Sequence, residues 1–279
     1  MVLIFGRHDL GAAVRGELGR RYFTWLAITP IFLIAVIFDG YVGAAIWLAF
    51  VLLLFHEYRR TVQLHANYAA VLFALILITL AIATKAPFLY FALPGACLLI
   101  LTVVPILTGR IDDLYGQMSL AGRGYLYLVW TLGHWIMLRE QAGPGLALVA
   151  GIGPAMSDVM QFAVGKLIGR HIISPNIHPR KAWEGLLGDL LGAAIVVWIF
   201  GFAIPERYTP VDRAVLVILI ALGSSWGDLI SSLVKRVAGA KDWGTALPGH
   251  GGLLDRANSL VIAMPLAYYH YVLVLYLHP

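Results

Sequence analysis

Apolar segments long enough to cross a membrane recur along the whole of this chain. Of its 279 residues, 60% are hydrophobic and only 13% are charged, and the mean hydropathy is +0.82. Most segments are apolar on every side, which indicates helices surrounded by lipid or by other helices. Because lipid tolerates only helices and closed barrels, we expect an all-α, polytopic integral membrane helical bundle.

About nine helical spans are predicted, each long enough for a hydrocarbon core of about 30 Å. We divide the chain into an N-terminal region, 1–140, with about five spans, and a C-terminal catalytic region, 141–279, with a polar loop at 231–259. The first 20 residues lack the apolar core of a signal peptide, so none is expected. The single cysteine, Cys97, lies in an apolar run and is expected to be a buried thiol. The predicted spans are 20–38, 41–56, 67–84, 87–107, 122–139, 144–166, 183–204, 212–234 and 259–277.

The basic residues predict the orientation of these spans. If the N-terminus is cytoplasmic, only Lys85, Arg139, Arg207 and Arg213 face the far side, so sixteen of the 20 Lys and Arg residues are cytoplasmic. This distribution follows the positive-inside rule. It places loops 167–182 and 231–259 on the cytoplasmic face, where nucleotides are, and the expected location is the bacterial inner (plasma) membrane.

The polar loop 231–259 is the strongest candidate for a site. Charge near a bilayer is costly, so a dense group of ionisable residues there usually has a function. Basic side chains suit phosphate, carboxylates suit a hard cation, and glycines let backbone N–H groups approach an anion. The loop contains Lys235, Arg236, Lys241, Asp242, Gly249, His250, Gly251, Gly252, Asp255 and Arg256.

Three carboxylates fall inside predicted spans: Asp158, Asp189 and Asp228. Around Asp228, the helical spacing of Ser224, Ser231 or Ser232, and Lys235 forms a polar stripe. The three carboxylates predict a common polar cavity, although structural ion pairs and an ion pathway remain open as alternatives. In the segment that holds Asp189, small residues at Gly185, Gly188 and Gly192 predict close helix packing.

The loop resembles the signature of a known enzyme family. The segment Ser232-Leu-Val-Lys235-Arg236, then Lys241-Asp242-Trp-Gly244, then Pro248-Gly249-His250-Gly251-Gly252-Leu-Leu-Asp255-Arg256 is similar to that of the phosphatidate cytidylyltransferases, or CDP-diacylglycerol synthases. Upstream blocks are similar too, namely Ser157-Asp158, Ser174-Pro175-Asn176, Pro179-Arg180-Lys181-Ala182-Trp183-Glu184-Gly185 and Gly227-Asp228-Leu229. The resemblance covers about residues 150–260.

The resemblance implies transfer of CMP from CTP to phosphatidic acid, giving CDP-diacylglycerol and pyrophosphate, with Mg²⁺ and an optional second cation. It implies partners in CTP, phosphatidic acid and the lipid bilayer, no nucleic acid, and homodimerisation as an option. The residues it assigns to metal are Asp228, Asp255 and Asn258. Those it assigns to catalysis are Lys235, Arg236, Lys241, Asp242, His250 and Arg256, and those to substrate binding are Asp158, Lys181, Trp183, Glu184, Ser232, Gly249, Gly251 and Gly252.

Four positions depart from the pattern that the resemblance implies. Asn258 stands where the family has Asp, Trp243 where it has a small hydroxyl residue, Ala182 where it commonly has Thr, and His178 where it often has Ser. Two alternative functions are kept. One is a CTP-dependent polyprenol or phytol-type lipid kinase, although no GxxxxGK[ST] motif occurs. The other is a cation-coupled membrane transporter, whose ions would use the acidic stripe.

Overall fold

The chain folds as a helical membrane bundle, as predicted. The computed structural model describes residues 29–38, 41–109, 111, 113–245 and 251–278, and residues 29–37 are helical. The remaining elements are α3 (Tyr41–Thr61), α4 (Ala66–Lys85), η1 (Pro87–Ala92), α5 (Leu93–Thr108), α6 (Leu114–Gly124), η2 (Tyr125–Trp130), α7 (Thr131–Ala142), α8 (Pro144–Ile168), β1 (Ile172–Ser174), β2 (His178–Ala182), α9 (Gly185–Ile199), η3 (Gly201–Ala203), α10 (Pro210–Val237) and α11 (Leu254–Leu277).

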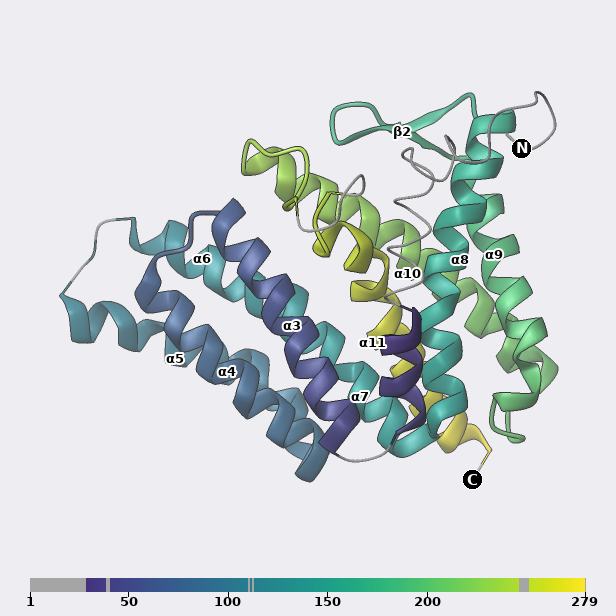
Figure 1. The fold of residues 1–279 in the computed structure, drawn as a ribbon, viewed down its shortest axis with the longest axis horizontal. Coiled ribbons are helices and arrows are strands. Elements are labelled where there is room, and N and C mark those ends of the chain that lie inside the picture. Colours follow the sequence, from purple (N-terminus) through teal and green to yellow (C-terminus); the bar gives the residue numbers. More distant parts are fainter. Residues whose placement is uncertain (1–28, 39–40, 110, 112, 246–250, 279) are drawn as a thin grey trace, which may run out of the picture.

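The helices form two groups that meet at α7 and α11 (Figure 1). Helices α3 to α6 lie on one side, and α8, α9 and α10 lie on the other. Helix α11 packs against α10, α8 and α7, and it also touches α3. The last helix therefore joins the two groups, and its first turn lies where they meet.

Six helical segments among the described residues are long and apolar enough to cross a membrane. They are Tyr41–Thr61, Ala66–Lys85, Pro87–Thr108, Pro144–Ile168, Pro210–Val237 and Leu254–Leu277. The segment predicted at 183–204 is a shorter apolar helix, Gly185–Ile199, followed by a 3₁₀ turn. The segment predicted at 122–139 lies in a run from α6 to α7 that the six-residue π-helix η2 interrupts. The predicted number of nine spans is therefore not established by these helices.

Helices α8 and α9 pack closely through glycine, as the spacing predicts. A Cβ atom added at Gly188 would lie 2.4 Å from the carbonyl oxygen of Met160. One added at Gly192 would lie 2.6 Å from the carbonyl oxygen of Met156. Neither position has room for a side chain, so these glycines hold Asp189 against the polar part of α8.

A short antiparallel hairpin connects α8 to α9, where the sequence indicated only a loop. Ile172 pairs with Ala182 and Ser174 pairs with His178. The hairpin lies at the same end of the bundle as the C-terminus of α10 (Figure 1). It matters for the site because β2 carries Lys181.

Candidate functional site

The polar stripe on α10 is confirmed, and each of its members contacts a different part of the chain. The Ser224 hydroxyl donates to Asp158 Oδ1 on α8, at 2.8 Å. Asp228 accepts from Lys181 on β2, and Lys235 donates to Asp255 on α11. The Ser231 hydroxyl accepts from the indole Nε1 of Trp243, at 2.8 Å. Helix α10 is thus the shared wall of the site.

The first pair of this site is Lys181 and Asp228. Lys181 Nζ lies 3.1 Å from Asp228 Oδ2, and the lysine side chain is fully buried whereas the aspartate side chain is 18% exposed. The other oxygen of Asp228 accepts a hydrogen bond from the amide nitrogen of Asn258 on α11. A buried ammonium group requires a counter-charge, and Asp228 provides it while keeping part of its surface accessible.

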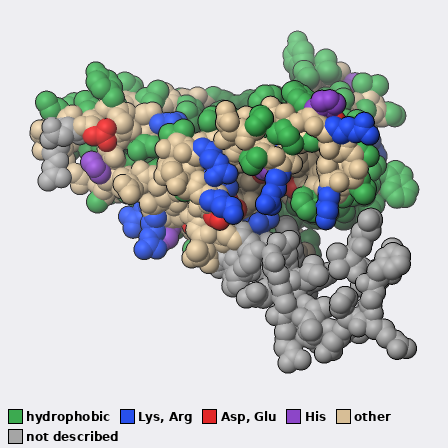
Figure 2. All heavy atoms as spheres, turned by 90° about the horizontal axis from the view of Figure 1, so that it is seen from above, with side chains coloured by type: hydrophobic (Ala, Val, Ile, Leu, Met, Phe, Trp, Pro, Cys, Tyr) green, Lys and Arg blue, Asp and Glu red, His purple; other side chains and the backbone are tan. Residues whose placement is uncertain are grey.

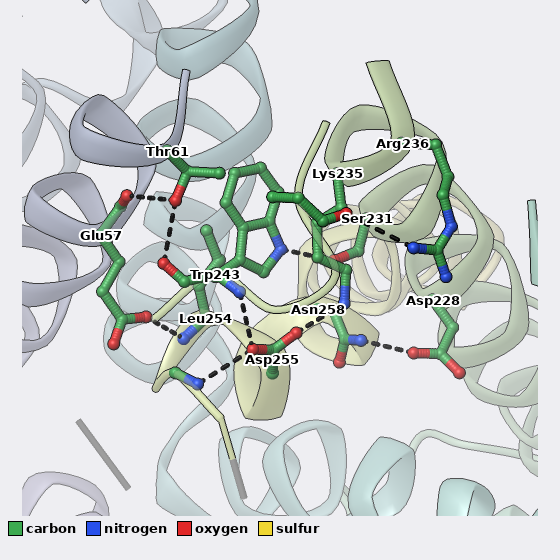
Figure 3. A network of polar contacts seen from close by, with 12 residues as sticks. Glu57, Thr61, Asp228, Ser231, Lys235, Arg236, Trp243, Leu254, Asp255 and Asn258 are labelled. Atoms are coloured by element: carbon green, nitrogen blue, oxygen red, sulfur yellow. Dashed lines mark hydrogen bonds and ion pairs between the residues drawn. The ribbon is translucent and has the colours of Figure 1, made fainter. Parts of the chain in front are cut away.

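The second pair is Lys235 and Asp255, shown in Figure 3. Lys235 Nζ lies 2.6 Å from Asp255 Oδ1, and both side chains are largely buried. Asp255 Oδ2 accepts the backbone N–H groups of Trp243 and Gly252, each at 2.9 Å. Asp255 therefore ties two separate parts of the loop between α10 and α11, at Trp243 and at Gly252, to the start of α11.

Two further carboxylates lie near the first pair. Asp158 is within electrostatic range of Asp228, Lys181 and Asp189. Asp189 is almost fully buried, and its Oδ2 accepts from the Ser225 hydroxyl at 2.8 Å. Its Oδ1 has no hydrogen-bond partner among the described residues. The structure therefore gathers the three predicted carboxylates around one buried lysine.

The glycines of the loop are needed for its shape. Gly251 has φ +79°, and a Cβ atom there would lie 2.8 Å from Asp255 Oδ2 and 3.4 Å from Asp242 Cβ. Only glycine adopts this backbone conformation readily, so the turn beside Asp242 and Asp255 depends on it. Gly249 and His250, which the resemblance assigns to substrate binding and to catalysis, lie outside the described residues.

Other predicted site residues lie at the edge of this arrangement. Trp183 is 57% exposed, and Ser232 is buried on α10. Arg236, Lys241, Asp242 and Arg256 are exposed at the same end of the molecule. Figure 2 looks onto this end and shows Lys and Arg side chains gathered there, with few Asp or Glu side chains visible.

Glu184 contacts the hairpin. It accepts from the backbone N–H groups of Arg170 and His171, at 3.1 and 3.3 Å, and from His171 Nδ1, at 2.6 Å. The hydrogen bond from the Arg170 backbone, followed by that from His171, lowers the pKa of Glu184 to about 2. Its contacts therefore close the base of the hairpin that carries Lys181.

His178, one of the departures from the family pattern, lies in the same hairpin. Burial lowers its pKa, and the charges of Asp228, Lys181 and Lys235 also act on it. Its Nδ1 is buried without a hydrogen-bond partner among the described residues. The imidazole is thus a neutral polar group beside the first pair.

The carboxylates fit a cation that is shared with a substrate better than one enclosed by protein. Among the described residues, no three His, Cys, Asp or Glu side chains form a metal-binding group. Asn258 turns its nitrogen to Asp228, and its oxygen accepts the backbone N–H of Ser259. Mg²⁺ commonly binds through one or two carboxylates together with substrate phosphates. Asp228 and Asp255 offer that donor chemistry.

One contributor to the site, the C-terminal end of α3, is not among the residues predicted from the sequence. Glu57 accepts the backbone N–H groups of Leu253 and Leu254, and Thr61 contacts the carbonyl oxygen of Trp243. Glu57 directly follows the predicted span 41–56, so it resembled an ordinary solvated loop residue. No local signal could have found it, since its partners lie 196 and 197 positions away.

Comparison with known proteins identifies one family whose model matches the chain and several curated proteins that are similar to it. The model of the cytidylyltransferase family matches residues 19–274, which is nearly the whole chain. The chain is 33% identical over 186 residues to YnbB of Escherichia coli K12, described as uncharacterized, covering 63% of this chain and 61% of YnbB. It is 39% identical over 126 residues to the phosphatidate cytidylyltransferase of Mycobacterium bovis, covering 45% of this chain and 41% of that protein.

A second relative carries the same description. The phosphatidate cytidylyltransferase of Synechocystis is 40% identical over 119 residues, covering 43% of this chain and 40% of that protein. The chain thus spans less than two thirds of the length of these curated relatives. The family model, in contrast, extends over both groups of helices. By this match, the chain belongs to the cytidylyltransferase family.

Proposed function

We propose that this protein is a nucleotidyltransferase, a phosphatidate cytidylyltransferase that transfers CMP from CTP to phosphatidic acid, with CDP-diacylglycerol and pyrophosphate as products. The observation that carries the proposal is the pair of lysine–aspartate contacts, Lys181–Asp228 and Lys235–Asp255, on the shared wall α10. Relatives named phosphatidate cytidylyltransferase support the choice of substrates.

The proposed reaction requires positioning more than a protein nucleophile. A phosphate oxygen of the lipid attacks the α-phosphorus of CTP, and the bond from that phosphorus to the bridging oxygen breaks. Pyrophosphate leaves with the bonding electrons. The second pKa of a phosphomonoester is about 6, so the attacking group is already anionic at neutral pH. The main difficulty is to bring two polyanions together, which cationic side chains can do.

The basic side chains of the site form two groups, one buried and one exposed. Lys181 and Lys235 are held by aspartates, so their positions are fixed before any substrate arrives. Arg236, Lys241 and Arg256 are exposed and can reach phosphates that approach from the aqueous phase. We assign the exposed group to the nucleotide phosphates and the buried pairs to the reacting end.

Asp228 and Asp255, with Asn258 beside Asp228, would hold Mg²⁺. When bound, Mg²⁺ supplies charge neutralisation on the phosphates. The chain's own residues bind and orient the substrates around it. We propose that this end of the molecule faces the cytoplasm of a bacterium, at the inner membrane, since the distribution of Lys and Arg follows the positive-inside rule.

A double-label assay tests the proposal. Purified protein is incubated with phosphatidic acid, Mg²⁺ and CTP labelled at either the α- or the γ-phosphate. We expect the α-label to enter the lipid product and the γ-label to be released as pyrophosphate. A γ-label in the lipid would instead show transfer of the terminal phosphate, and the absence of both labels from the lipid would refute the proposed nucleotidyl transfer. A parallel reaction with phytol or a polyprenol in place of phosphatidic acid tests the lipid-kinase alternative.

Variants connect the activity to the site. Asp228→Asn and Asp255→Asn should each abolish turnover per molecule of folded protein, and EDTA should abolish turnover reversibly. Each aspartate also pairs with a buried lysine, so folded protein is quantified by size-exclusion chromatography in detergent before the rates are compared. Glu206→Gln is a matched control, because Glu206 is exposed in the turn before α10. Full turnover in either aspartate variant would contradict the assignment of that residue.

A further inference from the structure

We propose that Glu57 of α3 is a positioning residue that fixes the backbone at Gly244 and at Gly252–Leu254, on the two sides of Asp255's contacts in the described part of the loop between α10 and α11. This inference rests on the proposed function, since it concerns the same site. Glu57 lies in the half of the chain that the sequence identified only as a series of membrane spans. Its side chain is 8% exposed, so its carboxylate is committed to internal contacts.

The carboxylate of Glu57 caps α11 from another helix. Its Oε1 accepts the N–H of Leu253 at 2.9 Å, and its Oε2 accepts the N–H of Leu254 at 2.8 Å (Figure 3). The first N–H groups of a helix have no partner within the helix, and the N-terminal end favours negative charge. Glu57 meets both needs, and Asp255 is the next residue along the chain.

Two glycines make room for Glu57. A Cβ atom at Gly244 would lie 2.9 Å from Glu57 Oε1, and one at Gly252 would lie 2.5 Å from Oε2. The backbone at both glycines therefore approaches the carboxylate more closely than a larger residue would permit. This explains two glycines of the signature by packing rather than by contact with phosphate.

The same end of α3 holds the other side of the loop. The Thr61 hydroxyl lies 2.9 Å from the carbonyl oxygen of Trp243, and the ring of Tyr58 packs 5.6 Å from the ring of Trp243, centroid to centroid. Trp243 in turn donates its backbone N–H to Asp255. The end of α3 thus contacts the loop both at Trp243 and at Leu253, and these two parts of the loop flank Asp255, the partner of Lys235.

A carboxylate that fixes main-chain position should affect the rate more than substrate binding. Catalytic groups must be held close to their productive geometry, and small displacements cost large factors in rate. In Glu57→Gln the amide keeps the size of the side chain but presents N–H₂ to one of the two N–H donors. We expect kcat to fall by about tenfold or more with little change in KM for CTP.

Amide hydrogen exchange measures the contact without relying on activity. In Glu57→Gln, the peptide that covers residues 251–258 should exchange faster than in the unmodified protein, whereas the hairpin peptide 170–182 should not change. Glu206→Gln should change neither peptide nor kcat. Glu57→Asp, which restores the charge on a shorter side chain, should recover part of both effects.

The outcomes separate the two proposals. If the unmodified protein does not form CDP-diacylglycerol, the proposed function fails, and hydrogen exchange alone decides the role of Glu57. Unchanged exchange at 251–258 in Glu57→Gln would overturn the contact. Faster exchange with the same kcat as Glu206→Gln would overturn the positioning role. A fall in kcat that only follows the loss of thermal stability, without rescue by Glu57→Asp, would also overturn it.

Discussion

Lys181 and Asp228 form an ion pair between a surface hairpin and a membrane helix, with Lys181 Nζ 3.1 Å from Asp228 Oδ2 and the lysine side chain fully buried. Asp158 and Asp189 also lie within electrostatic range of Lys181. Several carboxyl groups therefore surround one buried lysine, which makes the hairpin part of the site rather than a peripheral loop.

Removing the Lys181 charge should destabilise the protein strongly. In Lys181→Met, Asp228 loses its ion-pair partner, and breaking a buried pair typically costs about 3–5 kcal/mol. Lys166→Met, at an exposed position near the same end, should change the free energy of unfolding by less than about 0.5 kcal/mol. Thermal unfolding in detergent measures the stability of both variants. Equal stability of the two would contradict a structural role for the ion pair.

Much of this site could be predicted because helix geometry is local. The spacing of Ser224, Asp228, Ser231 and Lys235 is sufficient to place them on one face of α10. The burial of Lys181 could not be predicted, because it depends on a hairpin whose closure involves Glu184 and His171. Glu57 could not be predicted either, since a contact across 196 residues leaves no local pattern.

For the membrane spans, too, one part of the structure could be predicted from the sequence and another part could not. Apolar runs predict where helices lie, and α4, α8 and α10 match the predicted ranges to within three residues, whereas α3 ends five residues later and α11 begins five residues earlier than predicted. Whether a helix crosses the bilayer also depends on its length, and α9 has only 15 residues. Composition does not predict where α9 ends, because the residues that follow it are still apolar.

Cysteine labelling should place both parts of the site on one face of the membrane. Asn176→Cys in the hairpin and Thr245→Cys in the loop are at exposed positions, and Pro210→Cys lies at the opposite end of α10. We expect a membrane-impermeant maleimide to label positions 176 and 245 from the cytoplasmic side and position 210 from the other. Cys97, which is 1% exposed, should react with none of these reagents. Labelling of 176 and 245 from opposite sides would contradict a single site.

Glu184 should stabilise the hairpin at neutral pH and lose this effect as the pH becomes acidic. Its pKa falls from 4.5 to about 2 because backbone N–H groups and His171 donate to the carboxylate. A carboxyl group with a lowered pKa stabilises the fold above its unfolded pKa, and this stabilisation is lost as the pH falls through the folded value. The melting temperature of the unmodified protein should therefore exceed that of Glu184→Gln above pH 5. The difference should shrink between pH 4.5 and 2, and a difference independent of pH would contradict the ionic origin.

Asn258→Asp should make the stability of the protein depend on Mg²⁺. The Asn258 amide nitrogen donates to Asp228 Oδ1, so the substitution replaces a donor with a second carboxylate beside Asp228. Without a divalent cation, the two neighbouring carboxylates repel each other. The melting temperature of Asn258→Asp in EDTA should therefore be lower than that of the unmodified protein. With Mg²⁺, each added anionic ligand strengthens binding, so both stability and activity should reach half-maximum at a lower Mg²⁺ concentration. If Asn258 only supports the first turns of α11, the two proteins should give superimposable Mg²⁺ titrations, and that result would rule out a metal-ligand position at residue 258.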